Sequence, residues 1–68
     1  MRFNHHMLTL ARDSRGVIQA ELADMIGMGQ GTLSEYETGV LDAPDAFAED
    51  AGTALNYPAS FFFQAGRP

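Results

Sequence analysis

The sequence contains no cysteine, no tryptophan and no lysine, and its four basic residues are all arginine. Without cysteine, the chain can build neither a disulfide framework nor a thiolate metal site. This composition fits a reducing compartment, and we expect the protein to be cytoplasmic. Nine acidic residues oppose the four arginines and give a formal net charge of −5. Because proteins that bind nucleic acids are usually basic, this balance argues against a binder that relies on general electrostatic attraction.

Long apolar stretches are also missing. A membrane-spanning helix needs about 20 consecutive apolar residues, whereas the apolar runs of this chain are only a few residues long. The N-terminus has no long apolar segment ahead of a cleavage site, so we do not expect secretion. A chain of 68 residues is short enough that it should form one small domain with modest stability. We therefore predict a single domain over residues 1–68, with no membrane partner.

The side chains that could carry chemistry do not occur in useful combinations. His5 and His6 are adjacent, so on a helix they point in different directions and make a poor pair of metal ligands. The serines and carboxylates show no spacing that would join a nucleophile to a base. We therefore expect no enzyme activity, no cofactor and no metal, and no small-molecule substrate is evident.

Residues 19–39 have the pattern of two short helices joined by a tight turn. Apolar residues recur at helical spacing in both halves of this segment, at Leu22, Ala23 and Ile26 and then at Leu33 and Tyr36. Gly27 follows the first helix at a position that often needs a left-handed backbone. Ile18 stands just before that helix and has no side-chain acceptor, so a missing N-cap should cost about 1 kcal/mol. The segment predicts a helix-turn-helix.

The segment before residue 19 predicts one helix that packs on this motif. Asn4 is a suitable N-cap for a helix over residues 5–14, and Gly16 should end it. Leu8 and Ala11 should face the core, with help from Leu10.

The segment after residue 39 predicts two more helices. Asp45 can cap a helix that ends near Leu55, with Gly52 interrupting it at some cost. Pro58 should begin a last short helix, and residues 64–68 should form a tail. The predicted fold is an all-α, compact bundle of five short helices, in which the second and third form the helix-turn-helix.

The stretch QAELADMIGMGQGTLSEYETG resembles the helix-turn-helix of the lambda-repressor-like, Cro-type family, also called the XRE family. The resemblance extends to both flanks. LARDSRGVIQAELA resembles the family's first helix running into its second, and APDAFAEDAGTALNYPASFFF resembles the fourth and fifth helices. YPASFFF is also similar to a subset of the family in which this domain precedes a zinc metallopeptidase domain.

This resemblance implies sequence-specific binding of double-stranded DNA by a transcriptional regulator, and we expect a repressor that acts as a homodimer on a palindromic site. The third helix would read base edges in the major groove through Gln30, Gly31, Thr32, Ser34 and Glu35. The DNA backbone would be contacted by Gln19, Arg15 and Thr38. The family also pairs the residues that match Arg12 and Glu37, which implies a structural ion pair between the first and third helices.

Three of the proposed base-reading positions have distinct chemistry. A glutamine such as Gln30 can form two hydrogen bonds with adenine, through N6 and N7. Gly31 has no side chain, so it permits close approach of the backbone but reads nothing itself. Glu35 can accept a hydrogen bond from cytosine N4, or it can simply face solvent and repel nearby phosphates.

Two features leave other functions open. Three consecutive aromatic side chains cannot all point into one small core, so some of them are candidates for a dimer contact or for a partly covered cap: Phe61, Phe62 and Phe63. The excess of acidic residues favours an alternative in which the helix-turn-helix fold is a protein-interaction module. A third alternative is the targeting domain of a longer regulator with a peptidase or sensor portion.

Overall fold

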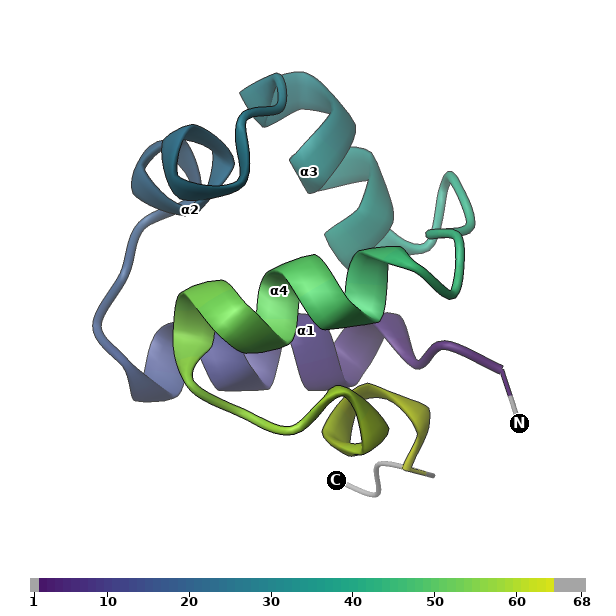
Figure 1. The fold of residues 1–68 in the computed structure, drawn as a ribbon. Coiled ribbons are helices and arrows are strands. Elements are labelled where there is room, and N and C mark those ends of the chain that lie inside the picture. Colours follow the sequence, from purple (N-terminus) through teal and green to yellow (C-terminus); the bar gives the residue numbers. More distant parts are fainter. Residues whose placement is uncertain (1, 65–68) are drawn as a thin grey trace.

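The computed structural model describes residues 2–64 and folds them into four α-helices and one short 3-10 helix. In Figure 1, α1 and α4 cross the molecule below α2 and α3, and the 3-10 helix η1 lies below both. The all-α prediction is confirmed, with these bounds: α1 His5–Ser14, α2 Gln19–Ile26, α3 Gln30–Thr38, α4 Phe47–Leu55 and η1 Ala59–Phe63.

The fifth helix is a 3-10 helix rather than the expected ordinary helix. Pro58 precedes it, as predicted, and its carbonyl accepts from the Phe61 N–H at 2.9 Å, which closes a turn of the tighter 3-10 type. The element spans 5 residues, slightly more than the roughly 3 to 4 residues that are typical of such helices. Of the predicted tail over residues 64–68, only Gln64 belongs to the described residues.

The core is formed by one face of each α-helix together with one aromatic residue from η1. Leu8 and Ala11 are fully buried. The prediction that Leu10 joins them in the core is wrong, because Leu10 is 53% exposed. Met7 takes that place, since it lies four residues before Ala11 on the same side of α1. The buried apolar residues are Met7, Leu8, Ala11, Leu22, Ala23, Leu33, Phe47, Ala48, Ala51, Leu55 and Phe62.

Asn4 caps α1 and also joins the two ends of the described chain. Its Oδ1 accepts from the backbone N–H of His6 at 3.0 Å, which is the predicted N-cap. Its own backbone N–H donates to the carbonyl of Phe62 at 2.7 Å. Its Nδ2 donates to the carbonyl of Gln64 at 2.8 Å. The start of α1 is therefore fixed against η1 and Gln64 by hydrogen bonds from both the backbone and the side chain of Asn4.

The starts of α2 and α4 use acceptors other than the N-cap side chain. At α2, Glu21 Oε1 accepts from the Ile18 N–H at 3.2 Å. This bond satisfies one of the N–H groups that the start of a helix leaves free, although the Ile18 side chain has no acceptor. At α4, the prediction that Asp45 is the N-cap is wrong, because Ala46 holds that position with a helical backbone. A turn brings the carbonyls of Pro44 and Asp45 to the N–H groups of Phe47 and Ala48, at 2.9 and 3.0 Å.

Gly52 is needed for close packing and does not interrupt α4. It is buried, and a Cβ atom at this position would lie 2.5 Å from the carbonyl oxygen of Tyr57. The chain reverses directly after α4 through Asn56, which has a left-handed backbone (φ 60°), and the Tyr57 N–H then donates to the Gly52 carbonyl at 2.9 Å. The absence of a side chain allows the return segment to lie against the helix.

Candidate functional site

Glu37 and Arg12 form a buried ion pair between α3 and α1. Arg12 Nε donates to Glu37 Oε2 at 2.7 Å, and Arg12 Nη2 donates to Oε1 at 2.9 Å. The side chains are only 14% (Arg12) and 4% (Glu37) exposed. The Arg12 guanidinium also donates through Nη1 to the carbonyl of Val17 at 2.9 Å, in the turn that leads to α2. This two-bond geometry fixes the position of the carboxylate inside the molecule.

Two neutral donors complete the shell around Glu37. Thr9 Oγ1 on α1 and Gln19 Nε2 at the start of α2 each donate to Glu37 Oε1, both at 3.2 Å. The structure thus brings Gln19 to the ion pair, which the sequence did not predict. Thr9 was also missed, although it precedes Arg12 by three residues and so shares a face of α1 with it. The Glu37 carboxylate on α3 therefore accepts hydrogen bonds from side chains of both α1 and α2.

The environment of Glu37 lowers the pKa of its carboxyl group. Burial alone raises this pKa, but the hydrogen bonds from Arg12, Gln19 and Thr9 and the positive charge of Arg12 together outweigh it. The hydrogen bond with Glu37 likewise raises the pKa of the Arg12 guanidinium. Both charges are therefore present at neutral pH.

The lowered pKa of Glu37 predicts a loss of stability in acid. A carboxyl group with a depressed pKa in the folded state contributes stability above its ordinary value, about 4.5, and that contribution disappears as the pH falls through the lower folded value. Urea unfolding measured between pH 7 and pH 2 should show this decrease below about pH 4.5. A variant in which Met replaces both Arg12 and Glu37 should show a smaller decrease over the same range. An equal decrease in the two proteins would contradict the assignment.

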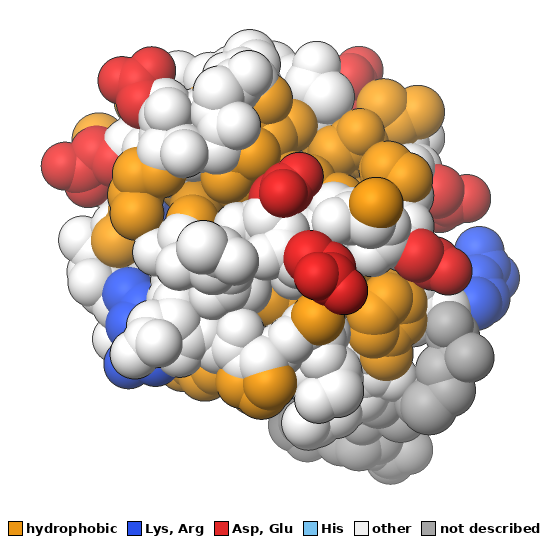
Figure 2. Space-filling view, viewed as in Figure 1, with side chains coloured by type: hydrophobic (Ala, Val, Ile, Leu, Met, Phe, Trp, Pro, Cys, Tyr) orange, Lys and Arg blue, Asp and Glu red, His pale blue; other side chains and the backbone are white. Residues whose placement is uncertain are grey.

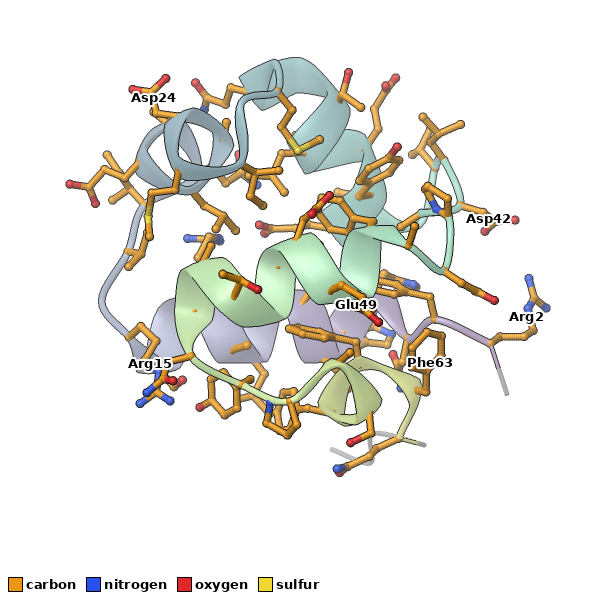
Figure 3. All side chains as sticks on the ribbon, viewed as in Figure 1. Arg2, Arg15, Asp24, Asp42, Glu49 and Phe63 are labelled. Atoms are coloured by element: carbon orange, nitrogen blue, oxygen red, sulfur yellow. The ribbon has the colours of Figure 1, made fainter. Side chains whose placement is uncertain are left out.

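Arg15 lies at the C-terminal end of α4, away from α3 (Figure 3). Its Nε donates to the carbonyl of Leu55 at 2.8 Å, and its Nη2 donates to the carbonyl of Asn56 at 3.0 Å. Its guanidinium carbon also lies 4.3 Å from the centre of the Tyr57 ring. These contacts satisfy carbonyl groups that the end of a helix leaves free. Arg15 therefore has a structural contact with α4, which uses two of its five N–H donors, and the residue remains exposed. Its contact with the DNA backbone stays a prediction.

The outer face of α3 carries the side chains that the sequence indicates for base reading. Gln30, Gly31, Glu35 and Thr38 are exposed, and Thr32 and Ser34 are half-buried. The Thr38 hydroxyl donates to the Glu35 carbonyl at 3.3 Å. Apart from Gly31, its two neighbours and the nearby backbone of α3, no described atom lies within 4 Å of the place where a Cβ on Gly31 would stand. Packing within the domain therefore does not require a glycine at this exposed position.

The faces of α2 and α3 carry no positive side chain. Neither helix contains an arginine or a lysine, whereas Glu21, Asp24 and Glu35 are exposed on them. Figure 3 shows Asp24 on the outer side of α2. In Figure 2, acidic side chains are spread over the visible face and arginine side chains appear only at its two sides. A polyanion on α3 would have to be held by neutral donors and backbone N–H groups.

The three consecutive phenylalanines separate into one core residue and two at the edge of the core. Phe62 has no exposed surface, and its ring stacks on Phe3 with centroids 5.7 Å apart. Phe61 and Phe63 are half-buried, and Phe61 stacks on Tyr57 at 4.4 Å. The expectation that the three cannot all face the core is confirmed. Phe62 has no exposed surface in the single chain, and the exposed surface of the three rings belongs to Phe61 and Phe63. The dimer contact stays a prediction.

No helix among residues 2–64 is long and apolar enough to span a bilayer. In the described part of the chain, the His, Asp and Glu side chains also form no group of three that could hold a metal ion. The His5 and His6 rings lie close together, with centroids 4.2 Å apart, so the expectation that they point in different directions is wrong.

A scan against models of protein families matches residues 8–61 with a model described as "Helix-turn-helix". The match begins in α1, includes α2, α3 and α4, and ends in η1. It therefore covers the candidate face of α3 together with the helices that support it. A search of curated proteins found no significant match.

Proposed function

Because the chain belongs to the helix-turn-helix family, in its Cro-type (XRE) form, we propose that it is a transcriptional regulator that recognises a specific double-stranded DNA sequence. The observation that carries the proposal is the outer face of α3. This helix presents polar side chains to solvent along one side, while its other side packs against α1 and α2 through Leu33 and Glu37. A helix supported in this way can enter the major groove with its N-terminal residues against the base edges.

Each exposed residue of α3 has a proposed role. Gln30 stands at the first position of the helix and would read an adenine, and Gly31 beside it lets the backbone approach closely. Thr32, Ser34 and Glu35 would contact neighbouring bases. Gln19, Arg15 and Thr38 would contact the phosphate backbone. Arg15 is exposed and gives two of its five N–H donors to carbonyls of Leu55 and Asn56, which leaves others for a phosphate. Binding over a promoter would make the protein a repressor by occlusion.

Selection from a random duplex library tests this function. An enriched sequence is expected, and a salt titration on that sequence should give a shallow slope of log K against log salt, because each cationic contact with a phosphate contributes about −0.9. The candidate face provides no such cation. Failure to enrich any sequence at low salt would reject DNA as the partner.

Gln30→Ala should weaken binding to the selected site by about 1 to 3 kcal/mol, because the variant loses two hydrogen bonds to one base. Binding to scrambled DNA should change little, since that binding depends on the phosphates. Isotherms on both duplexes at two salt concentrations measure the difference.

Glu35→Gln is the matched control for Gln30→Ala, because it removes one negative charge from the same face of α3. If Glu35 only repels phosphates, the change should strengthen binding to both duplexes. If it accepts from cytosine N4, the change should weaken binding at one base pair of the selected site. An equal loss for Gln30→Ala on selected and scrambled DNA would contradict base reading by Gln30.

We expect two copies of the chain to bind one palindromic site, because a single domain of this size covers few base pairs. Sedimentation of the protein with the selected duplex should give a 2:1 complex. Phe61 and Phe63, which are half-buried, are the remaining aromatic candidates for a contact between copies. A tight 1:1 complex on an isolated half-site would contradict this expectation.

One observation favours a protein-interaction module as the second candidate function. Val40 and Leu41 follow α3 directly and are 75% and 45% exposed, next to the acidic Asp42. An apolar loop with an acidic neighbour suits a basic protein better than it suits phosphates. Variants on α3 that change protein binding but leave DNA binding intact would favour this function. The similarity of YPASFFF to domains that precede a metallopeptidase supports a third proposal, a targeting role within a longer regulator.

A further inference from the structure

The carboxylate of Glu37 does more than close the ion pair, because it also faces the amide of Gln19. Arg12 fixes both oxygens of the carboxylate through bonds of 2.7 and 2.9 Å. The oxygen Oε1 is then held at a defined distance from α2, where Gln19 Nε2 donates to it at 3.2 Å. Gln19 is the first residue of α2 and is half-buried, so its amide lies between the core and the surface.

The charge of Glu37 determines which end of the Gln19 amide faces it. An ionised carboxylate only accepts hydrogen bonds, and an amide has an accepting oxygen at one end and two donating N–H groups at the other. A flipped amide would place its oxygen against Glu37 Oε1, where two acceptors would repel each other. The amide nitrogen must therefore face Glu37, with one N–H used there and the second left for another acceptor.

We propose that Glu37 is a positioning residue for DNA binding, which holds the Gln19 amide so that its second N–H donates to a phosphate of the DNA backbone. This inference rests on the proposed function. A glutamine side chain otherwise loses considerable rotamer freedom when it is ordered by a ligand. Because Glu37 orders it beforehand, less of that cost remains at the moment of binding. Arg12 neutralises the carboxylate, so the arrangement does not add a net negative charge near the phosphate.

A double-mutant cycle between Glu37→Gln and Gln19→Ala on the selected duplex tests the proposal. Gln19→Ala should weaken binding about tenfold, as expected for a lost hydrogen bond to a charged group. Glu37→Gln should weaken binding to a similar extent when Gln19 is present and by less than about twofold when Ala stands at position 19. Thr9→Val is the matched control, because Thr9 also donates to Oε1 at 3.2 Å but shares no hydrogen bond with Gln19 among the described residues. It should leave the affinity of the folded protein unchanged.

Circular dichroism at low temperature gives the folded fraction of each variant, to which the affinities are referred. If Glu37→Gln does not fold, replacing Arg12 and Glu37 together by Met removes the acceptor of Gln19 without leaving a buried charge. This paired variant should show the same dependence on Gln19.

The possible failures are distinguishable. If the wild-type protein binds no duplex at low salt, the proposed function and this inference are both overturned. If the wild type binds but Gln19→Ala has no effect, only the inference is overturned. If removal of Glu37 causes the same loss with either residue at position 19, Glu37 has a purely structural role and the inference is again overturned.

Discussion

Glu37→Gln should lower the free energy of unfolding by about 3 to 5 kcal/mol, because it removes the buried carboxylate that pairs with the guanidinium of Arg12. The Arg12 side chain is 14% exposed, and within residues 2–64 its further partners are the carbonyl of Val17 and, at 3.5 Å, the carboxylate of the exposed Asp13. Marginal stability is typical of small domains, so this loss is a large part of the total. Urea unfolding of both proteins at pH 7 measures it.

Two further variants distinguish the net stabilisation by the ion pair from the destabilisation caused by leaving one of its charges unpaired. Arg12→Met should be about as damaging as Glu37→Gln, since it leaves the carboxylate buried without its partner. The paired Met variant should be much less damaging than the sum of the two, because no unpaired charge remains. Small effects that add in the double variant would show that the two charges do not depend on each other.

Phe62→Ala should also cost about 3 to 5 kcal/mol, as expected for removal of a fully buried aromatic ring. The ring has no exposed surface and contacts Phe3 by stacking and Phe61 edge to face. The loss should appear as a large decrease in the thermal midpoint. Phe61→Ala provides the control, because a half-buried ring in the same helix should cost less.

The same variants decide whether Phe62 affects assembly. Sedimentation at a temperature where Phe62→Ala is still folded should give the same oligomeric state as the wild type, because Phe62 does not reach the surface. A change of oligomeric state without a loss of stability would contradict the placement of this ring in the core.

The helices could be predicted because their signals lie close together in the sequence. Asn4 and the apolar spacing after it defined α1, and Gly27 indicated the left-handed position after α2. The outer face of α3 followed from the same periodicity. The expectation for Leu10 was wrong on the same geometry: Leu10 lies about 100° around the helix from Ala11, whereas Met7 lies only about 40° from it, so helical spacing itself favours Met7.

The features that the sequence did not predict depend on contacts between distant residues. Arg15 is 40 and 41 positions from the two carbonyls that it binds, so nothing nearby distinguishes it from a free surface arginine. Gly52 looks like a helix breaker until the return of the chain at Tyr57 is known. The bond from Gln19 to Glu37 joins residues 18 apart, and it became visible only when three helices had been assembled around one carboxylate.

The double attachment of Asn4 has a consequence for biosynthesis. The N-terminal end of α1 is held by carbonyls of Phe62 and Gln64, and the side-chain bond spans 60 positions of the chain. Synthesis proceeds from the N-terminus, so α1 to α4 leave the ribosome before the residues that lock the first helix exist outside it. The core is also incomplete until Phe62 emerges. The nascent domain therefore cannot complete its fold until η1 and Gln64 have left the ribosome.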